Sequence, residues 1–144
     1  MLPKNVVLYA DDDIDDLQLI KEAFSPYSDN VELITVSDGL EAVTYLENIP
    51  LHQPTPCLII LDINMPRMDG KEALKTIRDI NRFEEIPAIL FTTSSQSKDK
   101  EFAKIYNAGF LTKPIDYHQV DKIAGQFIDH CSDEIKKQLL RDIQ

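Results

Sequence analysis

The segment that most constrains this chain is Leu58-Ile59-Ile60-Leu61, four apolar residues that lead directly into Asp62. Pro66 and Gly70 follow within eight positions of Asp62. A short apolar run bounded by turn residues is typical of a strand that is buried on both faces of a sheet. Asp62 would then lie at the carboxyl end of a central parallel strand, the edge at which open α/β sheets bind ligands. Alternatively, Asp62 could simply begin a polar turn.

Four other short apolar runs occur in the chain, and a stretch with helical periodicity follows each of the five. The expected strands are residues 6–10, 31–36, 58–61, 88–91 and 108–112. The expected helices begin at an Asp13 N-cap (with Asp16 at the position of a capping acid), after Gly39 and after Gly70, and cover 98–107 and 117–131. Alternating short strands and helices imply right-handed crossovers and a parallel sheet. We therefore predict an α/β fold, a five-stranded parallel sheet with helices on both faces.

A single domain with a hydrophobic core is expected from 144 residues, of which 43% are hydrophobic. We place this domain at residues 5–131 and a polar tail at residues 132–144. The spacing of four apolar residues in the tail predicts a short extra helix or an extension of the last one. They are Ile135, Leu139, Leu140 and Ile143.

The net charge and the cysteines narrow the class of protein. A formal net charge of −10 argues against binding to nucleic acid and favours cationic partners or metal ions. The sequence contains no apolar run of roughly eighteen residues, the length that a membrane-spanning helix needs, and its first apolar run is too short for a signal peptide. Cys57 and Cys131 lack metal-ligand spacing and are expected to be reduced structural thiols. These features predict a cytoplasmic protein.

Polar side chains are expected to gather where the parallel strands end, because all the carboxyl ends lie on one rim of the sheet. They are Asp11 and Asp12 after the first strand, Asp62 after the third, Thr92 and Thr93 after the fourth, and Lys113 after the fifth. Two carboxylates about 4 Å apart repel by roughly 4 kcal/mol at an effective dielectric constant of ~20. A divalent cation such as Mg²⁺, which prefers carboxylate and phosphate oxygens, would remove this repulsion.

This set of side chains is suited to phosphoryl transfer. A carboxylate can act as a nucleophile and become an aspartyl phosphate. Mg²⁺ and Lys113 would stabilise the charge of the phosphoryl group, and a threonine hydroxyl could donate a hydrogen bond to it. Each residue also has a plainer interpretation: helix capping for Asp11-Asp12-Asp13, a surface lysine for Lys113 and a strand-end hydroxyl for Thr92. Compatible chemistry at four strand ends is much less expected by chance.

Several motifs occur in a characteristic order along residues 5–131. They are Asp11-Asp12, Leu61-Asp62-Ile63-Asn64-Met65-Pro66 with Asp69-Gly70, Phe91-Thr92, and Lys113-Pro114. Together they resemble the response-regulator receiver domain of two-component signalling. The Thr-Thr-Ser and Met-Pro-Arg-Met-Asp-Gly segments are similar to those of single-domain regulators of the chemotaxis and phytochrome-linked kinds. The resemblance implies the (βα)5, flavodoxin-like receiver fold.

The resemblance also implies a role for each motif residue. Asp62 would be the phospho-acceptor, and Asp11, Asp12, Asp62 and the backbone carbonyl of Asn64 would bind Mg²⁺, with Mn²⁺ as a substitute. Thr92 and Lys113 would bind the phosphoryl group. Phe110 would turn inward as Thr92 is drawn to the phosphate, and the Lys113-Pro114 bond would be cis.

The predicted function is that of a stand-alone response regulator. It would accept a phosphoryl group from a histidine kinase or a histidine phosphotransfer protein, and would assist its own Mg²⁺-dependent phosphorylation and dephosphorylation rather than act as an enzyme on other substrates. The thirteen residues after Cys131 are too few for a DNA-binding domain. The signal would therefore be a changed contact with a downstream protein, or formation of a homodimer, through the fourth helix, fifth strand and fifth helix.

Three alternative functions differ from this one in the residues that they require. A pseudo-receiver that is not phosphorylated stays open, because Thr93 is β-branched where the family commonly has a small residue, which could narrow access for the phosphodonor. A haloacid-dehalogenase-type phosphatase would have Asp-x-Asp, whereas Asn64 stands two residues after Asp62. A nucleotide-binding flavodoxin-like protein would need a glycine-rich phosphate loop, but the chain has only four glycines.

Overall fold

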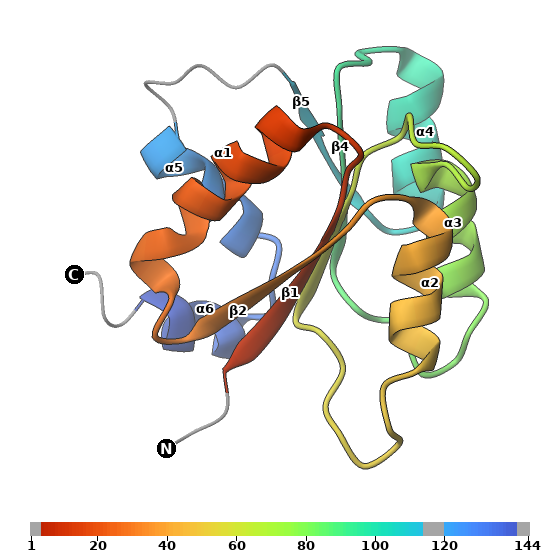
Figure 1. Ribbon diagram of the computed structural model, residues 1–144. Helices are drawn as coiled ribbons and strands as arrows, with labels where there is room; N and C mark the ends of the chain where they lie inside the picture. The colour runs from red at the N-terminus through yellow and green to blue at the C-terminus, as the bar shows by residue number, and fades with distance from the viewer. Residues whose placement is uncertain (1–3, 114–119, 141–144) are drawn as a thin grey trace.

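A parallel β-sheet forms the centre of the structure, a computed structural model that describes residues 4–113 and 120–140 (Figure 1). Its strands are β1 (Asn5–Ala10), β2 (Val31–Val36), β3 (Leu58–Leu61), β4 (Ala88–Thr92) and β5 (Gly109–Thr112). Their spatial order is β2-β1-β3-β4-β5, so β3 is the middle strand. The predicted α/β fold with a five-stranded parallel sheet is thereby confirmed.

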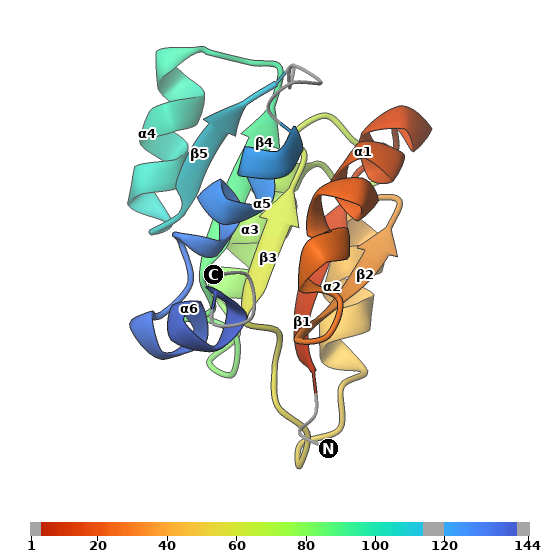
Figure 2. The same ribbon diagram turned by 90° about the vertical axis from the view of Figure 1, so that its left-hand side faces the viewer.

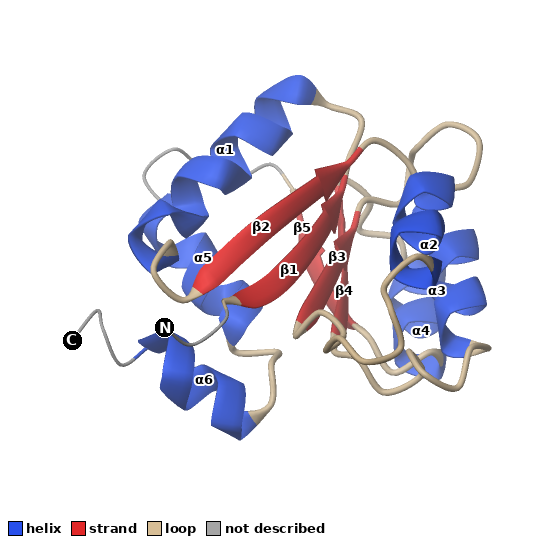
Figure 3. Ribbon diagram, turned by 60° about the horizontal axis from the view of Figure 1, so that its bottom comes forward, coloured by secondary structure: helices blue, strands red, loops and turns tan. Residues whose placement is uncertain are grey.

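Helices cover both faces of the sheet, as the sequence predicted (Figure 3). They are α1 (Ile14–Phe24), α2 (Gly39–Glu47), α3 (Gly70–Arg78), α4 (Ser97–Ile105), α5 (Val120–Ile128) and α6 (Asp133–Leu140). One face carries α1, α5 and α6, and the other carries α2, α3 and α4. No helix among the described residues combines the length and the apolar character needed to cross a membrane.

The alternation of side chains along the strands builds two cores, one on each face. On β1, Val7 and Tyr9 pack under α1 and α5, whereas Leu8 and Ala10 pack under α2 and α3. All four residues of β3 are fully buried, because both of its faces are covered. The continuous apolar run of this strand therefore follows from its central position.

Several element boundaries differ from the sequence-based prediction. The fourth helix covers Ser97–Ile105 rather than 98–107, and Thr92 is the last residue of β4 rather than the first residue after it. The first helix ends in a 3-10 turn, Ser25–Tyr27, because proline fits the start of such a turn but not a helix interior. The fifth helix covers Val120–Ile128, and residues 117–119 of its predicted range lie outside the described residues, as does Pro114 of the predicted cis bond.

The last helix, α6, packs against the lower part of the sheet, on the same face as α1 and α5 (Figure 2). Its Leu139 is fully buried in the core of that face, and Ile135 packs at the edge of the same core. The side-chain amide of Asn5 (Nδ2) donates a hydrogen bond to Gln138 Oε1 at 3.2 Å, which connects α6 to the start of β1.

Candidate functional site

Three aspartates meet at the carboxyl ends of the two central strands. Asp11 and Asp12 follow β1, and Asp62 follows β3. The pairing of β1 with β3 continues beyond the strands, since the Asp62 N–H donates to the Ala10 carbonyl at 3.0 Å. As a result, one carboxylate oxygen from each of the three aspartates lies within 4.8 Å of the others. Asp11 and Asp62 are buried and Asp12 is exposed, so the cluster is open to solvent on one side.

Lys113 provides the positive charge at this cluster. Its backbone N–H donates to the Thr92 carbonyl at 2.5 Å, which fixes it at the end of β5 beside β4. Its Nζ lies 2.6 Å from Asp11 Oδ2 and 3.7 Å from Asp62 Oδ2. Lys113 is 7% exposed, so these ion pairs are shielded from water and depend on one another.

Two further side chains, those of Asp16 and Tyr9, belong to the site, although the sequence did not assign them to it. Asp16 was expected to cap α1, but its Oδ2 lies 2.7 Å from Lys113 Nζ, and the Asp13 N–H donates to Asp11 Oδ1 instead. The Tyr9 hydroxyl donates a hydrogen bond of 2.5 Å to Asp11 Oδ2. Asp16 lies in the first turn of α1, just after the run Asp11-Asp12-Asp13, but nothing in the sequence fixes the direction of its side chain. Tyr9 stands two residues before Asp11, on the same side of an extended chain.

The ionisation of the site follows from burial and charge. Burial is the main cause that raises the pKa of Asp62 to about 6, and the nearby Asp11 carboxylate raises it further, while Lys113 opposes both. Burial alone would lower the pKa of Lys113, but its hydrogen bonds to Asp11 and Asp16 outweigh burial and raise it. Burial, with the Asp11 charge, also raises the pKa of Tyr9, which stays a hydroxyl donor. At neutral pH the site therefore holds an ionised Asp62 and a protonated Lys113.

The donor set fits a hard divalent cation. The cluster has four carboxylates, those of Asp11, Asp12, Asp16 and Asp62, against the one amine of Lys113, so it keeps an excess of negative charge. Mg²⁺ and Mn²⁺ favour carboxylate oxygens of this kind, and both retain water ligands that the open side at Asp12 can accommodate. The structure thus brings together the three acidic residues that the sequence predicted for a divalent cation.

The remaining predicted residues lie around the cluster with contacts of their own. Asn64 is exposed, and its backbone N–H donates to the Asp62 carboxylate. The Thr92 side chain is fully buried, and its Oγ1 accepts a hydrogen bond from the Ser94 N–H at 3.2 Å. Phe110 stands opposite Leu90 on the neighbouring strand and packs, partly buried, against the core under α3 and α4. Thr93 is exposed.

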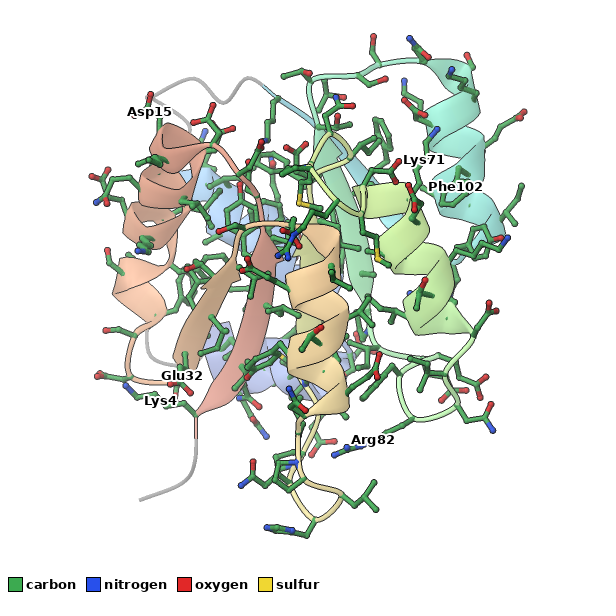
Figure 4. The ribbon with its side chains drawn as sticks, turned by 45° about the vertical axis from the view of Figure 1, so that its right-hand side comes forward. Lys4, Asp15, Glu32, Lys71, Arg82 and Phe102 are labelled. Carbon is green, nitrogen blue, oxygen red and sulfur yellow. The ribbon has the colours of Figure 1, made fainter. Side chains whose placement is uncertain are left out.

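A second polar cluster, which we call the Asp99 cluster (Lys71, Ser94 and Asp99), adjoins the site. Asp99 is buried in the first turn of α4, forms an ion pair with Lys71 of α3, and accepts a hydrogen bond from Ser94 Oγ at 2.5 Å. Lys71 also lies over the ring of Phe102 at 5.5 Å from its centroid, and Figure 4 shows these two side chains side by side between α3 and α4. The cluster lines a cavity of about 320 Å³ whose wall includes Asn64.

Comparison with known proteins gives a consistent result. The family model of the response regulator receiver domain matches residues 7–124. Response regulator Rcp1 of Synechocystis sp. is 34% identical over 99 residues, which cover 67% of this chain and 67% of Rcp1.

Solved structures of similar fold include the phosphorylated cyanobacterial phytochrome response regulator RcpA, with a TM-score of 0.78 and 27% identity, covering 90% of this chain and 98% of that one. The Mn²⁺-bound form of Rcp1 has a TM-score of 0.74 and 31% identity, covering 85% of this chain and 93% of that one. The strand order, the acidic cluster with its lysine, and these likenesses agree. The chain belongs to the response regulator receiver domain family.

Proposed function

We propose that Asp62 is the phospho-acceptor of this response regulator and that its donor is the phosphohistidine of a histidine kinase or a histidine phosphotransfer protein. The observation that carries the proposal is the position of Asp62 at the end of β3, beside the carboxylates of Asp11 and Asp12 and within 3.7 Å of the amine of Lys113. The protein would act in the cytoplasm, where such donors are found.

In the proposed step, an Asp62 carboxylate oxygen attacks the phosphorus atom of the phosphohistidine. The new P–O bond forms while the P–N bond breaks, and the imidazole leaves with the electron pair of that bond. Lys113 Nζ pairs most closely with Asp11 and Asp16 and lies 3.7 Å from Asp62 Oδ2. Its amine is therefore within reach of a phosphoryl oxygen carried by Asp62. Water attack on the phosphorus atom would later break its bond to the Asp62 oxygen, release inorganic phosphate and return the free carboxylate.

The metal in this proposal is Mg²⁺, held by Asp11, Asp12, Asp62 and the backbone carbonyl of Asn64. When bound, it would neutralise the carboxylates and the incoming phosphoryl oxygens. Tyr9 and the Asp13 N–H hold the two oxygens of Asp11 in place, so this ligand is oriented before any cation arrives. The likeness to Rcp1, for which a Mn²⁺-bound form is known, supports this assignment.

The signal would begin at Thr92. A phosphoryl group adds about −1.5 to −2 charges and needs donors for its oxygens. If the Thr92 hydroxyl turns toward the phosphoryl group, its Oγ1 loses the hydrogen bond that it accepts from the Ser94 N–H. Ser94 in turn donates a hydrogen bond to Asp99, which forms an ion pair with Lys71. The start of α4 would thus be released, and Phe110 would fill the space that Thr92 leaves. The changed face of α4, β5 and α5 would bind a downstream protein or a second copy of the chain.

The decisive experiment is intact-protein mass spectrometry after incubation with acetyl phosphate and Mg²⁺. We expect one added phosphoryl group on the native chain and none on the Asp62→Asn variant. Asp69→Asn is a matched control, because it also removes one acid, and asparagine can replace aspartate as the N-cap of α3. A gain on the Asp62→Asn variant would move the acceptor elsewhere on the rim.

No gain on the native chain would favour the pseudo-receiver alternative, provided that beryllofluoride, a phosphoryl mimic, also failed to bind. The exposed side chain of Thr93 is the feature on which that alternative depends. Replacement of Thr93 by alanine would then restore phosphorylation if restricted donor access were the cause.

A further inference from the structure

The only two cysteines of the chain lie next to each other, although 74 positions separate them. Cys57 immediately precedes β3, and Cys131 follows the end of α5. Their thiols form a hydrogen bond. Cys131 is buried in the core under α1, α5 and α6, and Cys57 packs at the edge of that same core. The pair therefore bridges the sheet and the layer of helices.

The pair is separate from the phosphorylation site. Cys57 and Asp62 stand at opposite ends of β3, five residues apart, and an extended chain rises about 3.3 Å per residue, so roughly 16 Å separates them. The backbone holds both cysteines firmly: the Cys57 N–H donates to the Val6 carbonyl at 2.9 Å, and the Cys131 N–H donates to the Ile128 carbonyl at 2.9 Å. Neither thiol has a role in the mechanism described above.

The two thiols are not equivalent. Cys57 is partly exposed, whereas Cys131 is buried. The hydrogen bond from Cys131 lowers the pKa of the Cys57 thiol, and the same hydrogen bond, together with burial, raises the pKa of Cys131. A thiolate is the reactive form of cysteine, and access by an oxidant requires exposure. The difference in exposure assigns Cys57 as the thiol that a peroxide reaches first and Cys131 as its neighbour that completes the reaction.

We propose that Cys57 and Cys131 form a redox modification site, at which a peroxide converts the two neighbouring thiols into an intramolecular disulfide. The Cys57 thiolate attacks one oxygen of hydrogen peroxide, the O–O bond breaks, and hydroxide leaves, which gives a sulfenic acid. The sulfur of Cys131 then attacks the Cys57 sulfur and expels the hydroxyl group as water, with the Cys131 proton neutralising the hydroxide. In total, the two thiols lose two protons and two electrons, and the peroxide takes them up and is reduced to two molecules of water.

The disulfide would tie the start of β3 to the junction of α5 and α6. It would close a loop that contains α4, β5 and α5, and thus the whole surface assigned above to the output. In a reducing compartment such a bond is transient and is removed by thiol exchange, so the site would report oxidation reversibly.

The test uses the full native chain, treated with hydrogen peroxide and then with iodoacetamide under denaturing conditions. Intact-mass measurement should show a loss of about 2 Da and no alkylated cysteine, and dithiothreitol should restore two alkylatable thiols. Two alkylatable thiols after the peroxide treatment, or three oxygen atoms added to one cysteine, would overturn the proposal. So would a product that runs as a dimer on a non-reducing gel.

The single variants Cys57→Ser and Cys131→Ser test the order of the two steps. With dimedone present, the Cys131→Ser chain should trap a sulfenic acid at Cys57, and the Cys57→Ser chain should form little or no adduct. An adduct that forms mainly on the Cys57→Ser chain would overturn the assignment of Cys57 as the attacking thiol. Circular dichroism of each variant before treatment verifies that it is folded.

Discussion

Replacement of Asp62 by asparagine should make the metal-free protein more stable, although Asp62 is the proposed acceptor. The Asp62 carboxylate is buried beside Asp11, and its pKa rises from 3.8 to about 6 in the folded chain. This displacement corresponds to about 3 kcal/mol of unfavourable free energy for the ionised form. Asparagine has nearly the same shape and no charge, so the free energy of unfolding should increase by up to about 3 kcal/mol at pH 7.

The pH dependence of this difference has a definite sign. A carboxyl group with a raised folded-state pKa binds more protons in the folded chain than in the unfolded one between pH 3.8 and about 6. The stability of the native chain relative to the Asp62→Asn variant therefore falls as the pH rises through this window and is level above it. Near pH 4, where the carboxyl is protonated in the folded chain, the two proteins should be nearly equal in stability.

Urea unfolding followed by far-ultraviolet circular dichroism, in buffers with a chelator, measures this difference. Asp69→Asn is the matched control and should leave the free energy of unfolding nearly unchanged. Addition of Mg²⁺ should stabilise the native chain more than the Asp62→Asn variant, and so narrow or reverse the gap. If the variant were equally stable or less stable than the native chain throughout pH 5 to 8 without metal, the argument from burial and charge would be wrong.

Three further predictions concern side chains around the site. Tyr9→Phe removes the hydroxyl that holds Asp11, and calorimetric titration should show Mg²⁺ affinity lowered on the order of tenfold. An unchanged Mg²⁺ affinity would show that Tyr9 does not orient Asp11. Gly70→Ala would place a methyl group against the Asp62 carbonyl oxygen, so we expect a loss of about 1–3 kcal/mol in urea unfolding, and an unaltered midpoint would contradict the close approach. Arg78→Met leaves four backbone carbonyl oxygens without their guanidinium donor, so the free energy of unfolding should fall by a value on the order of 3 kcal/mol, measured as a lower melting temperature. A melting temperature unchanged within error would show that water replaces the donor.

The fold and most of the site were predictable because the signals are local. The apolar run of β3 ends at Asp62, and parallel strands bring all their carboxyl ends to one rim. Asp11, Asp12 and Lys113 could be assigned to the same rim from the parallel direction of the strands alone, without knowledge of side-chain directions. The Asp13 N-cap was also correct, since its carboxylate accepts from the N–H groups of the first turn of α1.

Contacts that depend on side-chain direction could not be predicted in this way. Asp16 lies on the helix face that points to Lys113, and only the packing of α1 against the sheet fixes that face. The ion pair of Lys71 with Asp99 joins the first turns of two helices whose distance the sequence does not encode. Cys57 and Cys131 have no spacing that marks them as neighbours, because the contact arises from the docking of α5 on the sheet.

The pairing of Lys113 with Asp11 also has a consequence for the order in which the protein becomes competent. These two residues are 102 positions apart, and Lys113 comes from the last strand of the sheet. During synthesis the aspartates emerge long before their counter-charge, so a partly made chain holds the carboxylates without the amine that balances them. A fragment that ends before β5 would lack Lys113 altogether. The capacity to accept a phosphoryl group therefore arises only when the final strand docks, which couples function to completion of the sheet.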